Sequence, residues 1–272
     1  MSYGERAAIE GMLAMTKPRL AIEIGRAEGG SLRRIATHSR RVVSLDLVEP
    51  YSDTAAIANV RALTGDSHVL LPLELARIDD AGEMVDFVLV DGDHSTDGVR
   101  SDVEQLLNSP AVSDTVILVH DTLNEDVRHG LEQVDYNEYE HVAWVDLDFI
   151  PGYVARIPER FGECWGGVGL IVVDSTGAFR ADGPRRMTHL FEQSLLIWPA
   201  ARSIRAKGPI ATRDTSDLEL VASSSVSDAQ AHVSLLAADL QRHRAWLDEI
   251  QHSASWRLTS PLRSVKRALT RR

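Results

Sequence analysis

The chain has 272 residues, and its 44% hydrophobic and 25% charged residues are typical of a folded globular protein rather than a disordered chain. A net charge of −11 argues against nonspecific binding of nucleic acid, and the single cysteine, Cys164, excludes an internal disulfide and a thiolate metal cluster. Neither a run of about eighteen apolar residues nor a signal-peptide pattern is present, so we expect a cytoplasmic protein.

A glycine-rich turn follows the first predicted strand. Apolar residues at helical spacing predict a leading helix at residues 4–16, and residues 20–24 predict a short strand. The strand runs into Gly25-Arg-Ala-Glu-Gly29-Gly30-Ser31, after which helical spacing resumes. In this arrangement the backbone can approach a nucleotide-like ligand closely. The spacing is not the G-x-G-x-x-G of dinucleotide-binding folds, and a tight connection without a ligand is the alternative.

Acidic residues follow the next two strands. Residues 41–46 predict a strand that ends at Asp46, where a carboxylate can accept hydrogen bonds from both ribose hydroxyls of an adenosine group. A helix predicted through residues 55–60 leads to Leu63-Thr-Gly-Asp-Ser67, whose Asp66 and Ser67 can reach an adenine edge. Capping of the following helix is the alternative role for Asp66.

Two further strands end in carboxylates and imidazoles. The apolar run at residues 85–90 predicts a buried parallel strand, and Asp91-Gly-Asp-His94 follows it. A second run at residues 115–119 ends in His120-Asp121-Thr122. If the two strands are neighbours, these carboxylates and imidazoles surround one point, as a divalent cation with a nearby proton acceptor requires. Ordinary loop carboxylates that cap helices are the alternative.

The remaining elements complete a doubly wound, three-layer α/β domain with a sheet of about seven strands. Helices are predicted at residues 95–107 and around residues 127–131, and the last two strands at residues 141–149 and 166–173. Asp146 and Asp148 are expected on the exposed side of the first of these strands. The aromatic, Pro- and Gly-rich segment between the two strands is expected to form a loop that covers a pocket.

The carboxyl-terminal quarter is expected to be an appendage. We expect the domain at residues 1–206, a Ser/Thr/Asp-rich linker at 207–229 and a helical segment at 230–272. The apolar positions of the helical segment either dock on the domain or form the interface of a dimer. Residues 255–272 carry six basic residues and no acid. This basic tail either binds an anionic membrane surface or contacts the acidic domain or a partner.

In these motifs the chain resembles the class I S-adenosylmethionine-dependent O-methyltransferases that use a divalent metal. The turn Glu23-x-Gly25-x-x-x-Gly29-x-Ser31 is similar to their methionine- and ribose-binding motif. Asp46 resembles their ribose-binding acid, and Gly65-Asp66-Ser67 resembles their adenine loop.

The ends of the fourth and fifth strands resemble one branch, which includes cephalosporin hydroxylase-like proteins and macrolide-sugar and aminocoumarin-sugar O-methyltransferases. This resemblance implies that Asp91, His120 and Asp121 bind the metal, that Asp91 also contacts the cosubstrate, and that His94 accepts the proton. His120 departs from the usual Asp-Asp, Asp-Asn or Glu-Asp pair, and an imidazole ligand favours Mn²⁺ or a later transition metal over Mg²⁺.

The expected function is metal-assisted O-methyl transfer to a sugar, a glycan or a glycosylated metabolite. The segment at residues 253–263 supports a sugar acceptor, because it resembles a segment at the carboxyl end of bacterial glycosyltransferases and methyltransferases of cell-surface polysaccharide assembly. We then expect the protein to be cytoplasmic or peripherally bound to a membrane, and it could form a homo-oligomer. An NAD(P)-dependent nucleotide-sugar oxidoreductase or epimerase is one alternative, and a non-catalytic methyltransferase-like scaffold for polysaccharide enzymes is the other.

Overall fold

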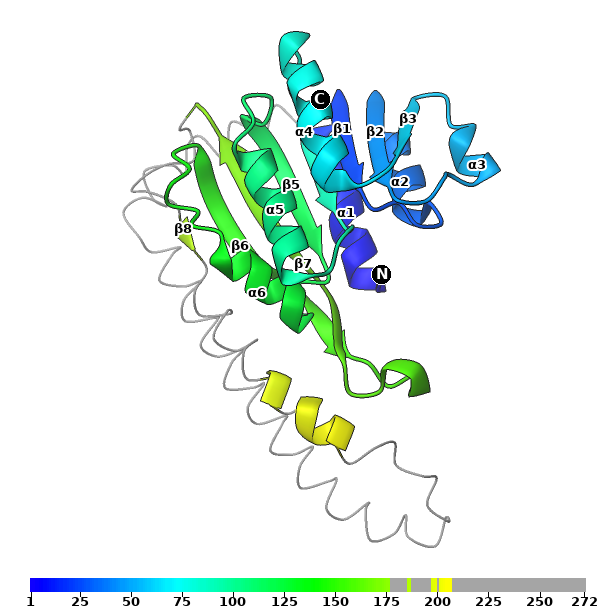
Figure 1. Cartoon of the computed structure of the whole chain (residues 1–272), viewed down its shortest axis with the longest axis vertical. Helices are drawn as coiled ribbons and strands as arrows, with labels where there is room; N and C mark the ends of the chain where they lie inside the picture. The colour runs from blue at the N-terminus through cyan, green and yellow to red at the C-terminus, as the bar shows by residue number, and fades with distance from the viewer. Residues whose placement is uncertain (177–184, 187–196, 200, 207–272) are drawn as a thin grey trace, which may run out of the picture. The chain divides into compact units, whose positions relative to one another are not determined.

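The computed structural model describes residues 1–176, 185–186, 197–199 and 201–206 (Figure 1). The predicted linker at 207–229, the helical segment at 230–272 and its basic tail lie outside these residues. Their contacts with a membrane, a partner enzyme or a second copy therefore stay predictions, as does the division into domain, linker and tail.

One mixed sheet forms the centre of the described part, with the strand order β3-β2-β1-β4-β5-β7-β6-β8. Strands β1 to β5 are parallel to one another, whereas β7 is antiparallel to both of its neighbours. The order reverses between β1 and β4, which opens a crevice at the carboxyl ends of the parallel strands. The strands are β1 Leu20–Ile24, β2 Arg41–Asp46, β3 Val60–Thr64, β4 Phe87–Val90, β5 Asp114–His120, β6 Val142–Val154, β7 Cys164–Asp174 and β8 Arg185–Arg186.

Helices cover both faces of the sheet, so the predicted doubly wound α/β fold is confirmed (Figure 1). Helices α4, α5 and α6 pack their apolar residues on one face, and α1 and α2 pack theirs on the other. The helices are α1 Tyr3–Thr16, α2 Gly30–His38, α3 Ser52–Ala55, α4 Ser67–Asp80, α5 Thr96–Leu107 and α6 Glu125–Gln133, with a 3₁₀ turn at Pro158–Arg160. Within the described residues, none of the helices has the length and apolar character that a membrane span requires.

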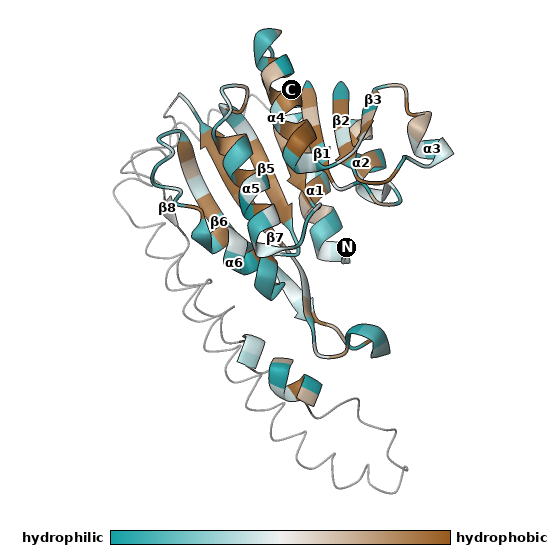
Figure 2. Ribbon diagram, viewed as in Figure 1, coloured by the Kyte–Doolittle hydropathy of each residue, from teal (hydrophilic) through white to brown (hydrophobic). Residues whose placement is uncertain are grey.

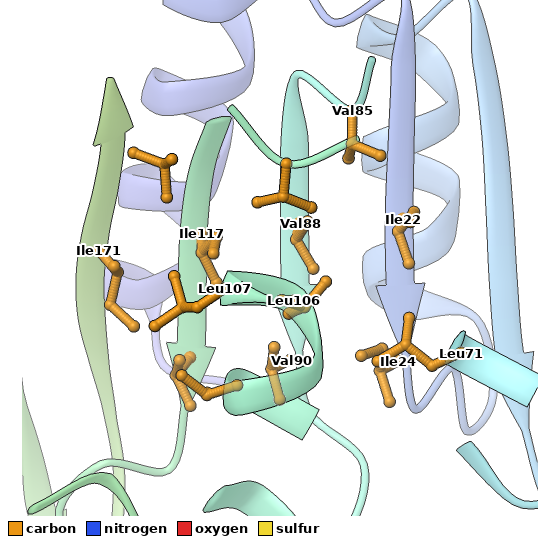
Figure 3. Packing of buried hydrophobic residues seen from close by; sticks show 14 of the residues in the cluster. Ile22, Ile24, Leu71, Val85, Val88, Val90, Leu106, Leu107, Ile117 and Ile171 are labelled. Atoms are coloured by element: carbon orange, nitrogen blue, oxygen red, sulfur yellow. The ribbon is translucent and has the colours of Figure 1, made fainter. Parts of the chain in front are cut away.

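Alternating side chains of the central strands fill the two layers of the core. Ile22 and Val88 point to the layer under α4 to α6, whereas Ala21 and Phe87 point to the layer under α1 and α2 (Figure 3). Figure 2 shows the apolar residues gathered on the central strands and hydrophilic residues on α5 and α6. Both faces of β1 and β4 are buried, which explains why these strands are continuous apolar runs rather than alternating ones.

Two local predictions are wrong. The helix predicted through residues 55–60 ends at Ala55, and Val60 begins β3, because its neighbour Asn59 is held by the carbonyls of Ala36 and Ser39 while Val60 pairs with β2. The segment at 151–165 is mostly an extension of β6 and β7 into a long hairpin, closed by the 3₁₀ turn, rather than an irregular loop.

Asp146 and Asp148 do not lie on an exposed side of β6, contrary to the prediction. Asp146 is buried, and its carboxylate accepts the backbone N–H of Asp148 at 3.0 Å. Asp148 pairs with the guanidinium of Arg128, whose Nη2 lies 2.9 Å from its Oδ2. The arginine comes from α6, so Asp148 faces a helix rather than solvent.

Candidate active site

A cleft of about 680 Å³ lies at the carboxyl ends of β1 to β4, within the range of sites for small molecules and cofactors. The predicted cofactor-binding residues Gly25, Asp46, Asp66 and Asp91 line it, and so does His94. The predicted residues Glu23, Gly29 and Ser31 do not belong to the lining. The complete lining is Ile24, Gly25, Ala27, Leu45, Asp46, Leu47, Val48, Gly65, Asp66, Ser67, His68, Asp91, Gly92, Asp93 and His94.

The glycine turn brings the ends of β1 and β4 into contact. A Cβ atom on Gly25 would lie 2.0 Å from the carbonyl oxygen of Asp91, and its φ of 85° is also in the left-handed region. Ala27 has a φ of 42°, at the position where a G-x-G motif has its second glycine. The turn therefore keeps the backbone course of a ligand-binding glycine loop although its sequence departs from the motif.

Asp46 anchors this turn from the end of β2. Its Oδ2 accepts the backbone N–H groups of Arg26 at 2.8 Å and Ala27 at 2.9 Å, and its Oδ1 accepts that of Val48 at 2.9 Å. Burial opposes ionisation, but these backbone donors outweigh it and lower the pKa of Asp46. An ionised carboxylate thus lies at the cleft wall and supports the turn.

Arg26, inside the turn, is a residue that the sequence did not reveal. Its side chain is buried and donates hydrogen bonds to the carbonyls of Ser44 and Leu63 at 3.1 Å each, and to that of Val48. It therefore ties the end of β1 to the ends of β2 and β3 beneath the cleft. Since a charged residue in a glycine-rich turn is usually exposed, its type and position carried no signal.

Glu23 and Ser31 lie behind the turn. Glu23 is fully buried, and its carboxyl accepts the hydroxyls of Ser31 at 2.6 Å and Ser44 at 2.8 Å. Burial raises the pKa of Glu23 to about 7. Gly29 begins α2 with a φ of 78°. The cofactor contacts predicted for these three residues stay predictions, and the structure shows them joining β1, α2 and β2.

Asp66 has the capping role and also lies at the cleft, while its contact with an adenine edge stays a prediction. It caps α4, since its Oδ1 accepts the backbone N–H of His68 at 2.9 Å, and it also lines the cleft with Ser67. The capping interaction orients the carboxylate at the end of the loop.

The four polar side chains at the ends of β4 and β5 meet, because these strands are neighbours. The Nε2 atom of His94 lies 2.9 Å from Asp121 Oδ2 and 3.6 Å from Asp91 Oδ1. The Nδ1 atom of His120 lies 2.9 Å from Asp91 Oδ1 and 3.3 Å from Asp121 Oδ2. Ligand atoms of Asp91, His94 and Asp121 all lie within 4.8 Å of one another, so this group could hold a metal ion.

Burial and opposite charges perturb the pKa of each imidazole. Contacts with Asp121 and Asp91 raise the pKa of His94 to about 9. Burial by itself would lower the pKa of His120, but its contacts with the surrounding carboxylates outweigh burial and raise that pKa to about 12. The imidazoles in turn hold the pKa of Asp121 well below its usual range, although burial opposes this.

The backbone of β7 and a residue of α1 complete the cluster. Asp121 has a φ of 57°, and its Oδ1 accepts the backbone N–H of Gly166 at 2.6 Å. The buried carboxylate of Glu5 lies beside His120, with Oε2 3.4 Å from its Nε2. No pattern in the sequence pointed to Glu5, because an acid at the third position of a helix indicates only a capping box.

An aromatic side chain borders the cluster next to His94. The ring of Trp165, from β7, lies edge-on to His94 with 5.8 Å between the ring centroids. The guanidinium of Arg160 lies over the indole, 4.3 Å from the ring centroid. The hairpin therefore supplies an apolar surface and a cation next to His94.

The family model of a methyltransferase domain matches residues 22–122, from the glycine turn to the end of β5. No curated protein sequence matches the chain. Similar solved structures include an O-methyltransferase from Bacillus cereus in complex with SAH, 19% identical, with 63% of this chain and 82% of that chain covered and a TM-score of 0.44. The O-methyltransferase TomG from Streptomyces achromogenes, in complex with SAM, is 16% identical, with 64% of this chain and 81% of that chain covered and a TM-score of 0.46. The methyltransferase MycE from the mycinamycin biosynthetic pathway, in complex with Mg and SAH, is 16% identical, with 69% of this chain and 55% of that chain covered and a TM-score of 0.44.

These identities and TM-scores are too low to carry an argument by themselves. The family match rests on the same residues that form the glycine turn, the cleft and the ends of β4 and β5. The matched region runs through the parallel strands from β1 to β5, and β7 lies antiparallel between β5 and β6. Residues 22–122 therefore match a methyltransferase domain, in agreement with the resemblance that the motifs indicated.

Proposed function

We propose that the protein transfers the methyl group of S-adenosylmethionine to a hydroxyl oxygen of a sugar, a glycan or a glycosylated metabolite. The observation that carries this proposal is that one cleft joins two kinds of site. Its walls hold the glycine turn and Asp46, which suit an adenosine group, and its edge holds Asp91 and His94, which contact Asp121. A methyl donor in the cleft would thus face a carboxylate and imidazole cluster.

The donor is held by the turn and by the acids that follow β2 and β3. Asp46 keeps Ala27 and Val48 in place through backbone hydrogen bonds, and its two oxygens retain further acceptor capacity for ribose hydroxyls. Asp66 and Ser67 lie farther along the same wall, where an adenine edge would lie. This fixed wall orients the donor so that the methyl group approaches the acceptor oxygen in line.

In its neutral form, His94 is the proton acceptor of the proposed reaction, and because its pKa is raised to about 9, this form becomes more abundant as the pH rises toward that value. Its imidazole lines the cleft and is partly exposed, so it can meet a hydroxyl there, and Asp121 orients it through the 2.9 Å contact. Removal of the hydroxyl proton makes the oxygen a nucleophile for the sulfonium methyl carbon, and S-adenosylhomocysteine is the leaving group.

The proposal includes a divalent metal, Mg²⁺ or Mn²⁺, at Asp91, His120 and Asp121. The donor set fits a divalent metal, because the buried Nδ1 atom of His120 lies 2.9 Å from Asp91 Oδ1 and 3.3 Å from Asp121 Oδ2. His94 also reaches these carboxylates, but it belongs to the lining of the cleft, whereas His120 does not and is buried. A metal at this site supplies Lewis acidity that lowers the pKa of a bound hydroxyl.

The hairpin supports a sugar as the acceptor. Trp165 offers an apolar ring beside His94, and Arg160 adds a cation that suits hydroxyl or anionic groups. The resemblance of residues 253–263 to proteins of polysaccharide assembly points to the same acceptor class.

Turnover with a radiolabelled methyl donor tests the proposal. Purified full-length protein with Mg²⁺ or Mn²⁺ is incubated with nucleotide sugars, oligosaccharides, glycosylated metabolites and a catechol, and labelled products are separated. We expect label on a sugar hydroxyl, and label on the catechol alone would reject the sugar. Calorimetry with S-adenosylmethionine and NAD separates the rivals, since NAD binding alone supports an oxidoreductase. Donor binding without any labelled acceptor supports a scaffold.

A further inference from the structure

A buried acid from the first helix contacts the imidazole at the end of β5. Glu5 has no solvent exposure, although it lies only three residues from the N-cap Ser2 of α1. Its Oε2 lies 3.4 Å from His120 Nε2, and its Oε1 accepts the backbone N–H of Gly167 at 2.8 Å. A capping box requires only a carboxylate near the helix start, so it does not explain why this one is buried against the cluster.

Two adjacent backbone groups of β7 hold the carboxylates on either side of His120. Gly167 donates its N–H to Glu5, and Gly166 donates its N–H to Asp121 at 2.6 Å. A Cβ atom on Gly166 would lie 2.5 Å from Glu5 Oε1, so Glu5 packs directly on this strand. The position of the Glu5 carboxylate is therefore determined by the sheet as well as by its helix.

The contacts of His120 divide between its two ring nitrogens. Nε2 faces Glu5, and Nδ1 faces Asp91 at 2.9 Å and Asp121 at 3.3 Å. A carboxylate that accepts the N–H of one ring nitrogen fixes the ring orientation and directs the other nitrogen toward a metal. The imidazole is 8% exposed, so no solvent-facing orientation competes.

We propose that Glu5 is a positioning residue that holds His120 with Nδ1 directed between Asp91 and Asp121, so that α1 completes the metal site. This inference rests on the proposed function. It assigns to the first helix a part in metal binding, from a position 115 residues before His120.

Mn²⁺ affinity of the full chain, measured by electron paramagnetic resonance, tests the inference. Glu5→Gln keeps an oxygen that can accept the Gly167 N–H. It replaces Oε2, which faces His120 and also accepts the backbone N–H of Ser2, with an amide. We expect Mn²⁺ binding about 10–100-fold weaker. Binding of S-adenosylhomocysteine should stay within about twofold of wild type, because a local contact is lost and not the fold. The matched control is Glu10→Gln, on the same helix, which removes a surface pair with His38 at 3.2 Å and should change neither affinity.

A second background makes the test specific for His120. In His120→Asp the imidazole is absent, so adding Glu5→Gln should leave Mn²⁺ affinity unchanged or improve it by removing charge repulsion. This comparison also decides the matter if Glu5→Gln alone does not fold. Unchanged Mn²⁺ affinity in Glu5→Gln, or the same loss in the His120→Asp background, would overturn the inference.

The wild-type protein separates this inference from the proposed function. Absence of Mn²⁺ binding together with methyl transfer in EDTA would overturn the inference and leave O-methyl transfer standing. Mn²⁺ binding that depends on Glu5, without binding of S-adenosylmethionine, would count against the proposed function and support the inference.

Discussion

Replacing Glu23 by glutamine should reduce the dependence of stability on pH. Burial raises the pKa of Glu23 from 4.5 to about 7, against the hydrogen bonds from Ser31 and Ser44. Because the pKa is raised in the folded state, the stabilising contribution of the protonated carboxyl is complete below the unfolded pKa. It is lost as the pH rises through the folded pKa. A shift of about 2.5 pKa units corresponds to roughly 3 kcal/mol, of which about 2.5 kcal/mol is lost between about pH 5 and about pH 8.

Glutamine imitates the protonated acid at this position. Its carbonyl oxygen can accept the Ser31 hydroxyl, and its amide can donate to the Ser44 hydroxyl oxygen. Urea unfolding of wild type and Glu23→Gln at the two pH values gives the free energy of unfolding of each. The difference between the two proteins isolates Glu23 from other titrating groups, and we expect it to shift by about 2.5 kcal/mol in favour of the variant on going to the higher pH.

Glu28→Gln, an exposed position in the same turn, is the control and should show no pH-dependent difference from wild type. A difference between wild type and Glu23→Gln that is equal at both pH values would refute the reasoning, because Glu23 would then be ionised in the folded protein. Calorimetry on the same variant tests the predicted cofactor contact. Since Glu23 does not line the cleft, we expect an unchanged Kd for S-adenosylhomocysteine.

Three other substitutions test the cleft. Asp46→Ala should weaken binding of S-adenosylhomocysteine by about 2–4 kcal/mol in calorimetry, since it removes charge-assisted hydrogen bonds to ribose and the support of the turn, and an unchanged Kd would contradict this. His94→Ala should lower turnover about 10²–10⁴-fold with donor affinity unchanged, and normal single-turnover rates would exclude it as the proton acceptor. Gly25→Ala should prevent folding or donor binding, because its Cβ would overlap a carbonyl at the end of β4. Gly82→Ala, with a φ of 66° and nothing within 4 Å, should cost only about 1–2 kcal/mol in thermal unfolding, and equal effects of the two would argue against the close contact.

Patterns along the sequence were sufficient for the sheet and for much of the cluster. A buried strand is a continuous apolar run, and a polar residue at its end marks the sheet edge, so β4 and β5 could be recognised from their residues. Since the carboxyl ends of neighbouring parallel strands share one edge, the meeting of Asp91 and His94 with His120 and Asp121 could also be predicted. The contacts of 2.9–3.6 Å among these side chains agree with that geometry.

Only the tertiary structure determined which groups pack against each polar side chain. Asp148 was expected on an exposed side, but Arg128 of α6 covers it. Arg26 turned inward because β2, β3 and the loop after β2 each offer it a carbonyl. Glu5 is far from His120 in sequence, and the packing of α1 against β5 and β7 brings them together. The sequence pattern shows which residues are apolar and where strands end, because these properties are local. The burial, protonation and partners of a charged side chain depend on distant segments, so they were determined only when the chain folded.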